Sequence, residues 1–387
     1  MLKGDVIGNR YRLMRIVFIC RRHCPGEAWT NRILAYAKGF LKHGVEVCIL
    51  YLISDKNRTP YQIDIPNIKV INMWETDGML ARRYRPLSYI RNILRIGRFL
   101  QNDDICFLTD ASGLYVNQLR FIRKKIKIVC EVTEHPAILS GGKSLLTWLR
   151  THKIKKVDKI FVISRALKEY FIDLGINDNQ IHIVNMFVDM TRFDGVKKCS
   201  SNNYIAYCGN VSKDKDGVDI LIEAFAIFHK SYPEYTLEIY GRSVGNTIEE
   251  LKKLAKELEI ENNVIFTGMI DASAIPQKLV NATVLALSRP DNLQNKNGFP
   301  TKLGEYLMSG NPVVVTAVGE IPFYITDGYN AYLVKPGSVV DFADKLLRAV
   351  SEIDTHPEIP LRGKCLAESE FSYLEQTKKA LEYIINI

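Results

Sequence analysis

Apolar runs of strand length that alternate with helical patterns constrain the fold of this 387-residue sequence more than any other feature. In the first half such runs occur at residues 14–20, 45–52, 125–132, 159–164 and 181–187. The alternation starts again at residues 204–209, 236–241 and 264–268, with helical patterns between these runs over residues 218–231 and 248–259. Helices that alternate with buried strands predict parallel sheets covered on both faces, so the expected fold class is α/β.

The second start of this alternation indicates two domains. The chain is longer than one ordinary domain, and the polar stretch Lys197–Asn203 is the best candidate for a linker. We expect doubly wound domains over residues 1–195 and 196–365, and a C-terminal helix over residues 366–387 that packs back on the first domain. Ligands gather beyond the carboxyl ends of the strands in such sheets, which predicts a site in a cleft between the domains.

Hydropathy and cysteine usage favour a cytoplasmic protein. No apolar stretch approaches the length of about 18 residues that a membrane span needs. The apolar run near the N-terminus is too short for the core of a secretory signal. The eight cysteines are scattered, and no second ligand pair follows Cys20 and Cys24 at zinc spacing. We therefore expect reduced thiols and no bound metal.

Charge is distributed unevenly along the chain. Residues 1–195 contain 32 Lys/Arg and 18 Asp/Glu, a balance of +14, whereas residues 196–387 contain 20 and 25, a balance of −5. Apolar and basic residues mix at helical spacing at residues 79–100, 119–128 and 151–159. These segments are either core helices with a solvated face or contacts to an anionic membrane surface, and the charge balance favours the membrane. We expect no nucleic-acid partner, because no recognised DNA-binding or RNA-binding pattern is present.

Residues 297–321, NGFPTKLGEYLMSGNPVVVTAVGEI, are the strongest functional signal. Pro300 suits the start of a helix, whose first N–H groups at Thr301 and Lys302 then face an anion. Glu305 lies one turn inside this helix, within reach of a sugar hydroxyl near that anion. A phosphate at a helix N-terminus and a carboxylate for a ribose together predict a nucleotide site.

Several motifs, taken in chain order, resemble those of the family 4 retaining glycosyltransferases. They are HIVNMFVDMTRFD at 182–194, a strand ending at Gly209 with Lys215 downstream, VIFTG at 264–268, and the block from Gly298-Phe299-Pro300 through Glu305 to SGNPVV at 309–314. The resemblance spans roughly residues 14–345. It implies the GT-B fold, in which two facing Rossmann-like domains bind the acceptor on the first domain and the nucleotide sugar donor on the second.

The resemblance also implies roles for individual residues. Gly209, Asn210 and Lys215 are expected to hold the donor diphosphate, with Asn210 in place of the family's arginine. Asn297 and Glu305 match the family's paired glutamates, so Asn297 replaces the first of them and Glu305 holds the ribose. Catalytic roles fall on His135, which faces the donor sugar, and on Lys215 and Asn297. The remaining donor-binding positions are Gly26, Gly268, Gly298, Phe299, Pro300, Thr301 and Lys302.

Two of these residues also have ordinary interpretations. His135 follows a strand and precedes Pro136, where a histidine is commonly a structural hydrogen-bonding group. Lys215 lies in the charged loop SKDKDGVD, where a lysine is usually only solvated. Their positions beyond strand ends favour function.

The expected function is transfer of a hexosyl group from a nucleotide diphosphate sugar, with retention and without a metal or other cofactor. The acceptor is expected to be a glycan or a lipid-linked molecule in cell-surface polysaccharide or glycolipid assembly, at the inner face of the membrane. The alternative is a nucleotide-sugar epimerase or a non-catalytic nucleotide-sugar-binding relative of the same fold. The order of the motifs favours transfer, whereas the missing arginine and first glutamate favour a non-catalytic relative.

Overall fold

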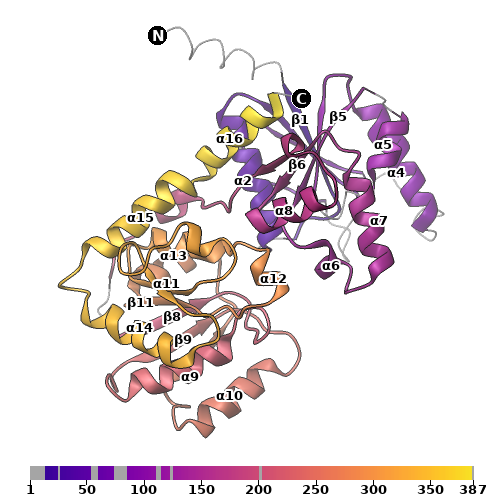
Figure 1. The fold of residues 1–387 in the computed structure, drawn as a ribbon. Helices are drawn as coiled ribbons and strands as arrows, with labels where there is room; N and C mark the ends of the chain where they lie inside the picture. Colours follow the sequence, from indigo (N-terminus) through magenta and orange to yellow (C-terminus); the bar gives the residue numbers. More distant parts are fainter. Residues whose placement is uncertain are drawn as a thin grey trace. The chain divides into compact units, whose positions relative to one another are not determined.

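The computed structural model describes residues 14–24, 27–53, 60–73, 85–109, 115–122, 125–199 and 203–385 (Figure 1). The chain divides into two compact units. The N-terminal unit comprises Met1–Asn185 and Tyr373–Ile387, and the C-terminal unit comprises Met186–Ser372. Each unit is built on a parallel sheet, as the alternation in the sequence predicts.

Within the described residues, the N-terminal unit has a seven-stranded sheet of order β3-β2-β1-β4-β5-β6-β7. Its strands are β1 (Arg15–Cys20), β2 (Glu46–Tyr51), β3 (Ile68–Asn72), β4 (Ile105–Leu108), β5 (Lys127–Val132), β6 (Lys159–Val162) and β7 (Ile181–Ile183). The central strands are mostly apolar because helices cover both faces, and every residue of β1 from Ile16 onward is fully buried.

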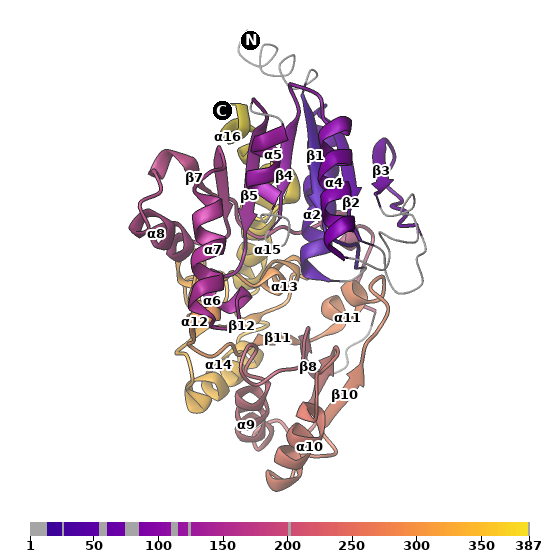
Figure 2. The same ribbon diagram turned by 90° about the vertical axis from the view of Figure 1, so that its right-hand side faces the viewer.

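The helices of this unit cover both faces of the sheet. One face carries α2 (Ala28–Lys42) and the C-terminal helix α16 (Tyr373–Ile385), which pack together. The other face carries α4 (Arg85–Phe99), α5 (Val116–Ile122), the short α6 (Pro136–Leu139), α7 (Ser144–Ile154) and α8 (Arg165–Asp173) (Figure 2). A 3-10 helix, η2 (Asp178–Gln180), precedes β7.

The described part of the C-terminal unit has a six-stranded sheet of order β10-β9-β8-β11-β12-β13. Its strands are β8 (Tyr204–Cys208), β9 (Thr236–Tyr240), β10 (Val264–Gly268), β11 (Val284–Leu287), β12 (Val313–Thr316) and β13 (Tyr332–Val334). Its helices are η3 (Met190–Phe193), α9 (Val218–His229), α10 (Thr247–Glu257), α11 (Ile275–Asn281), α12 (Leu293–Lys296), α13 (Thr301–Met308), η4 (Ile321–Phe323), α14 (Val339–Ser351) and α15 (Glu358–Glu370). α14 packs beside α9, whereas α13 packs between α11 and α15.

The first boundary between the units lies at 185/186 instead of the expected 195/196. Met186 and Val188 belong to the C-terminal unit because they pack on α13: a Cβ at Gly304 would stand 2.1 Å from Val188 Cγ2 and 3.4 Å from Met186 Sδ. The N–H of Val188 also donates to the carbonyl oxygen of Phe371 at 2.8 Å. The expected linker at 197–203 therefore lies inside the C-terminal unit.

The second boundary lies at 372/373 instead of 365/366. Helix α15 remains with the C-terminal unit because it packs on α13, where a Cβ at Gly363 would stand 2.9 Å from Leu307 Cδ2. Of the two last helices, α15 and α16, only α16 belongs to the N-terminal unit. None of the helices that the structure describes is long and apolar enough to cross a membrane.

Candidate functional site

The strands of the C-terminal unit end in a closely spaced set of backbone loops. Gly209 follows β8, and its N–H donates to the carbonyl oxygen of Tyr240 at 2.8 Å. The N–H of Gly241 donates to the carbonyl oxygen of Gly268 at 2.8 Å. Because Gly209 has no Cβ, the side chain of Lys302 can lie against it, for a Cβ there would stand 2.0 Å from Lys302 Cε. This edge of the sheet therefore brings the loop after β8 to the first turn of α13.

Lys302 forms a buried ion pair with Asp216 at this edge. Its Nζ donates to Asp216 Oδ1 at 2.6 Å and to the hydroxyl oxygen of Tyr207 at 2.7 Å. The side chain of Asp216 is 1% exposed and that of Lys302 is 18% exposed. Burial lowers the pKa of Lys302 to about 8, although the carboxylate of Asp216 opposes the shift. Burial acts to raise the pKa of Asp216, but Lys302 and Arg289 hold it below its ordinary value.

Arg289, which follows β11, is a second buried cation beside Asp216. Its Nε lies 3.6 Å from Asp216 Oδ1. Among the described residues this buried Nε has no hydrogen-bond partner. Lys302, Arg289 and Asp216, which we call the cation cluster, thus combine two positive charges with one negative charge. An anion bound here would neutralise the excess positive charge.

Two amide side chains hold the loop that carries Lys215. Asn292 Nδ2 donates to the carbonyl oxygen of Asp214 at 2.6 Å, and Asn295 Nδ2 donates to that of Lys215 at 2.8 Å. Gly217 has φ +62°, and a Cβ there would stand 2.0 Å from the carbonyl oxygen of Ser288. The loop after β8 is therefore fixed against the segment after β11. The structure brings Lys215 and α13 to the same edge of the sheet, while the catalytic role of Lys215 stays a prediction.

Helix α13 begins at Thr301, where the sequence predicts it. Pro300 is its N-cap residue, with φ −72°, and no side chain caps the helix. Phe299 is buried and stacks on Tyr324 with 5.3 Å between ring centroids, which anchors the Gly-Phe-Pro turn. Lys302 is the second residue of α13, so the first turn carries both free N–H groups and the residue with the ammonium group. A helix N-terminus with a neighbouring cation can bind phosphate.

Glu305, the predicted ribose ligand, already has a partner in the C-terminal unit. Its carboxylate is paired with the guanidinium of Arg192 in η3, whose Nη2 also donates to the carbonyl oxygen of Ala272 at 2.8 Å. Burial raises the pKa of Glu305, and Arg192 opposes that shift. A ribose hydroxyl would have to share the carboxylate with Arg192. The ribose role of Glu305 stays a prediction.

The other predicted donor positions of this unit have local structural contacts. Asn297 is buried at the C-cap of α12, and its Nδ2 donates to the carbonyl oxygen of Leu293 at 2.9 Å. The carbonyl oxygen of Asn210 accepts a hydrogen bond from Tyr207 at 2.5 Å. Gly268 ends β10 with φ +71°, and a Cβ at Gly298 would stand 3.0 Å from the carbonyl oxygen of Gln294. None of these contacts assigns a ligand, so their donor roles stay predictions.

His135 lies beyond the carboxyl end of β5 in the N-terminal unit. It caps α6, where its Nδ1 accepts a hydrogen bond from the N–H of Ala137 at 3.2 Å. Its ring lies 4.3 Å from that of Tyr170, and burial lowers the pKa of His135. With Nδ1 accepting, the neutral ring carries its proton on Nε2. Gly26, the other predicted residue of this unit, lies outside the described residues.

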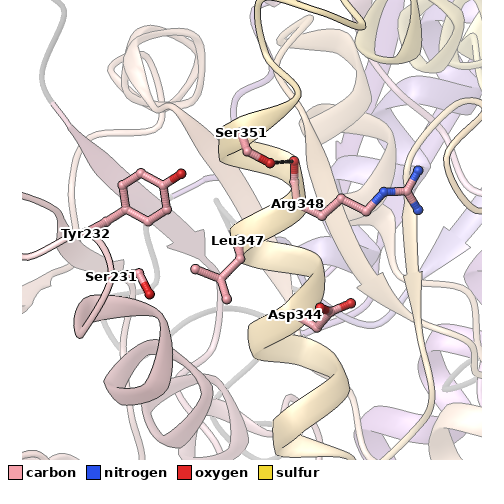
Figure 3. Close-up of a pocket in the computed structure, with 6 residues that line it drawn as sticks. All are labelled: Ser231, Tyr232, Asp344, Leu347, Arg348 and Ser351. Atoms are coloured by element: carbon pink, nitrogen blue, oxygen red, sulfur yellow. Dashed lines mark hydrogen bonds between the residues drawn. The ribbon is translucent and has the colours of Figure 1, made fainter.

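A groove on the C-terminal unit lies between the end of α9 and helix α14 (Figure 3). Ser231 and Tyr232 face Leu347 and Ser351 across it, and Ser351 donates to the carbonyl oxygen of Arg348 at 3.1 Å. Both helices run back from the carboxyl edge, so their ends reach the opposite edge of the sheet. Ligands of such sheets bind at the carboxyl ends of the strands. We therefore assign the candidate site to the cation cluster and not to this groove.

Two family models together match most of the chain. The chain matches the family Glycosyltransferase Family 4 over residues 30–192 and Glycosyl transferases group 1 over residues 202–352. The chain belongs to the family 4 glycosyltransferases. This glycosyltransferase is 23% identical over 338 residues to an uncharacterized glycosyltransferase of Methanocaldococcus jannaschii. The aligned region covers 83% of this chain and 81% of the relative. It is 25% identical to the N-acetyl-alpha-D-glucosaminyl L-malate synthase of Bacillus anthracis over 68% of each chain.

Solved structures of low sequence identity share the fold of this glycosyltransferase. Anabaena HepE in complex with UDP has a TM-score of 0.77 at 17% identity, covering 97% of this chain and 100% of that one. Sucrose-phosphate synthase from Thermosynechococcus elongatus has a TM-score of 0.76 at 15% identity, covering 96% and 98%. The expected GT-B fold class, with two Rossmann-like α/β domains, is confirmed.

Sequence reasoning missed three charged residues of this edge. Arg289 follows an apolar run that the pattern did not assign to a strand, although Ser-Arg-Pro directly after LAL is a strand-end signal. Asp216 lies in the charged loop that carries Lys215, and nothing local indicated that it is the carboxylate partner of Lys302. Arg192 lies in the interdomain motif, and nothing local indicated its pairing with Glu305.

Proposed function

We propose that this glycosyltransferase moves a hexosyl group from a nucleotide diphosphate sugar to a glycan or lipid-linked acceptor, with retention of configuration. We place the reaction in cell-surface polysaccharide or glycolipid assembly at the cytoplasmic face of a membrane. The proposal rests on the cation cluster, where Lys302 and Arg289 outnumber Asp216 beside the N-terminus of α13. HepE of Anabaena is described in complex with UDP and with UDP-glucose, which supports uridine donors as the first to test.

In the proposed reaction, the donor diphosphate binds between Lys302 and the first N–H groups of α13, with Lys215 beside it. The bond between the anomeric carbon and the diphosphate oxygen breaks, and the acceptor oxygen bonds to the same face of that carbon. The acceptor proton passes to the departing diphosphate. Fixed cations and N–H groups stabilise the negative charge that grows on the diphosphate more in the transition state than in the ground state.

We further propose that His135 and Asn297 contact the donor sugar. Burial lowers the pKa of His135, which favours the uncharged ring, and because Nδ1 accepts a hydrogen bond, Nε2 of that ring can donate one to a sugar hydroxyl. Asn297 would contact the sugar in place of the family's glutamate. Because protein cations neutralise the leaving group, we expect transfer without a divalent metal. Dialysis against EDTA should leave the rate unchanged, and restoration of a lost rate by Mg²⁺ or Mn²⁺ would refute metal independence.

A donor panel with mass-spectrometric product analysis tests the proposed function. The purified protein is incubated with UDP-linked and GDP-linked hexoses and a panel of glycan and lipid-linked acceptors. Formation of a glycosylated acceptor with release of the nucleoside diphosphate supports transfer. Conversion of one nucleotide sugar into another supports an epimerase, and binding without turnover supports a non-catalytic relative. The anomeric configuration of the product, read by NMR, tests retention.

A substitution pair links the activity to the cation cluster. Lys302→Met removes the ammonium group, whereas Lys213→Ala removes an exposed lysine of the loop after β8 that pairs with Glu250. Turnover should fall in the first variant and persist in the second. Equal turnover in both would refute the cation cluster as the diphosphate site.

A further inference from the structure

We propose that the helical layer formed by α4, α5 and α7 of the N-terminal unit is a docking surface for an anionic lipid membrane. These helices lie on one face of the sheet, and α5 contacts both α4 and α7 (Figure 2). We call this layer the docking face. The inference deepens the proposed function, in which the acceptor is lipid-linked, but lipid binding itself can be measured without donor or acceptor.

The docking face exposes apolar side chains where a surface helix ordinarily carries polar groups. On α7 the buried side consists of Thr151 and Ile154. Its outer side exposes Leu145, Leu146, Trp148 and Leu149, of which Leu145 is 67% and Trp148 56% exposed. The neighbouring helices add Ile90 and Leu94 on α4 and Phe121 on α5. A concentration of exposed apolar side chains on one face marks an interaction surface.

The charge of the same layer selects an anionic partner. The sequences of α4, α5 and α7 contain Arg85, Arg91, Arg95, Arg98, Arg120, Arg150 and Lys153, and not one Asp or Glu. Lys143 precedes α7, and Lys155 and Lys156 follow it. By contrast, α8 and α16 of the same unit each contain two acidic and two basic residues. Leucine and tryptophan with flanking lysine and arginine are typical of helices that lie in the surface of anionic membranes.

Several of these basic groups have partners within the unit. Arg120 is paired with Asp158 at 2.7 Å, and Arg95 Nη1 donates to the carbonyl oxygen of Met73 at 2.6 Å. We therefore assign lipid contact to the basic residues that border the exposed leucines, Arg150 and Lys153. A second copy of the chain is a poorer partner, because two such layers would bring like charges together.

The docking face reaches the edge of the sheet that carries His135. This residue caps α6, and α6 contacts α7. Leu145 and Leu146 are in the first turn of α7, so the apolar end of that helix is the end nearer to α6. A membrane bound to α7 would therefore hold a lipid-linked acceptor beside the carboxyl edge of this sheet.

Vesicle sedimentation tests the proposal on the full chain. Wild type is mixed with vesicles of phosphatidylcholine alone and with vesicles that also contain phosphatidylglycerol. We expect binding only to the anionic vesicles, and binding about tenfold weaker or more for Leu145→Gln/Leu149→Gln, because two leucines leave the lipid. Arg150→Gln/Lys153→Gln should also weaken binding and reduce its dependence on salt. The matched control is Leu361→Gln, which alters a 58% exposed leucine on α15 of the C-terminal unit and should bind as wild type.

Tryptophan fluorescence locates the contact. Anionic vesicles should shift the emission of wild type to shorter wavelength, and Trp148→Phe should bind the vesicles while losing most of the shift. Equal binding to neutral vesicles, or unchanged binding of the leucine double variant, would overturn the proposal. So would a wild-type dimer in analytical ultracentrifugation that the leucine variant converts to monomer, because the face would then be a self-association surface.

UDP affinity of the same variants separates this inference from the proposed function. The leucine variant should bind UDP as wild type does, since the changed side chains are exposed and lie in the other unit from the cation cluster. A protein that binds anionic vesicles through α7 but no nucleotide would refute the proposed function and support the docking face. A protein that binds nucleotide but no vesicle would refute the docking face and leave the proposed function supported.

Discussion

Lys302 has one interaction in the structure and a second one in the proposed function. It neutralises Asp216, which is almost fully buried, and it is itself exposed enough to meet a ligand at the N-terminus of α13. Breaking a buried ion pair from one side leaves an uncompensated charge. The effects of Lys302 on stability and on binding must therefore be separated by a second substitution at its partner.

Lys302→Met should weaken UDP binding by roughly tenfold to a hundredfold, because the variant loses a hydrogen bond to a charged group. It should also lower the free energy of unfolding by about 3 kcal/mol, because Asp216 loses its nearest cation. Adding Asp216→Asn should restore most of the stability but not the affinity. Calorimetry with UDP and urea unfolding measure the two effects. Recovery of affinity in the double variant would contradict a direct contact between Lys302 and the diphosphate.

Donor affinity should depend on pH through the same ammonium group. The pKa of Lys302 is lowered to about 8 by burial, so the side chain is charged below that pH and becomes neutral above it. UDP affinity should therefore fall as the pH rises above about 8. Lys302→Arg keeps its charge across this range and should remove the fall. An affinity that declines equally in wild type and Lys302→Arg would assign the titration to another group.

At the scale of elements, α13 connects the candidate site to the boundary of its unit. Its first turn carries Lys302, and its middle packs on Val188 through Gly304, where a Cβ would stand 2.1 Å from Val188 Cγ2. The absence of a side chain at Gly304 thus allows the segment 186–188 to lie against the helix. This close contact holds Arg192 within reach of Glu305.

Gly304→Ala should destabilise the C-terminal unit by about 1–3 kcal/mol, because the new methyl group has no space in this contact. Val188→Ala removes the obstructing methyl groups and should relieve that cost. A double-mutant cycle by denaturant unfolding should therefore show a favourable coupling of about 1 kcal/mol or more. Additive effects of the two substitutions would show that Gly304 is required for another reason.

At the scale of the whole molecule, the chain passes from one unit to the other near residue 185 and returns near residue 372. The returning helix α16 packs on α2, where a Cβ at Gly39 would stand 2.1 Å from Thr377 Oγ1. Gln376 Oε1 accepts a hydrogen bond from the N–H of Asn185 at 2.8 Å. The N-terminal unit is therefore completed by the end of the chain.

Ending the chain at Ser372 should loosen α2 without affecting α13. In hydrogen exchange measured by mass spectrometry, amides of α2 should exchange at least about tenfold faster than in the full chain, since the removed helix covers them. The exchange of α13 serves as the internal control, because its contacts are with α11 and α15. Unchanged protection of α2 would contradict a structural role for α16.

Much of each sheet could be predicted from residue pattern, and the failures have physical reasons. β1 and β2 lie within predicted runs because central parallel strands are continuously apolar. β3 was not predicted, since as an edge strand it keeps Lys69 exposed and has no fully buried run. The boundaries at 185 and 372 were missed because a polar stretch such as Lys197–Asn203 resembles a linker whether or not it lies inside a unit.

The start of α13 was determined by the sequence alone, because Pro300 fixes a backbone conformation that suits a helix N-terminus. The same holds for the alternation of strands and helices, which reflects local periodicity. The ion pair of Lys302 with Asp216, the approach of Arg289 and the pairing of Glu305 with Arg192 were decided only by the tertiary structure. These charges lie far apart in the chain. Parallel strands bring the loops that follow them to one edge of the sheet. A charge that is buried there needs an opposite charge beside it, and only the folded chain determines which one that is.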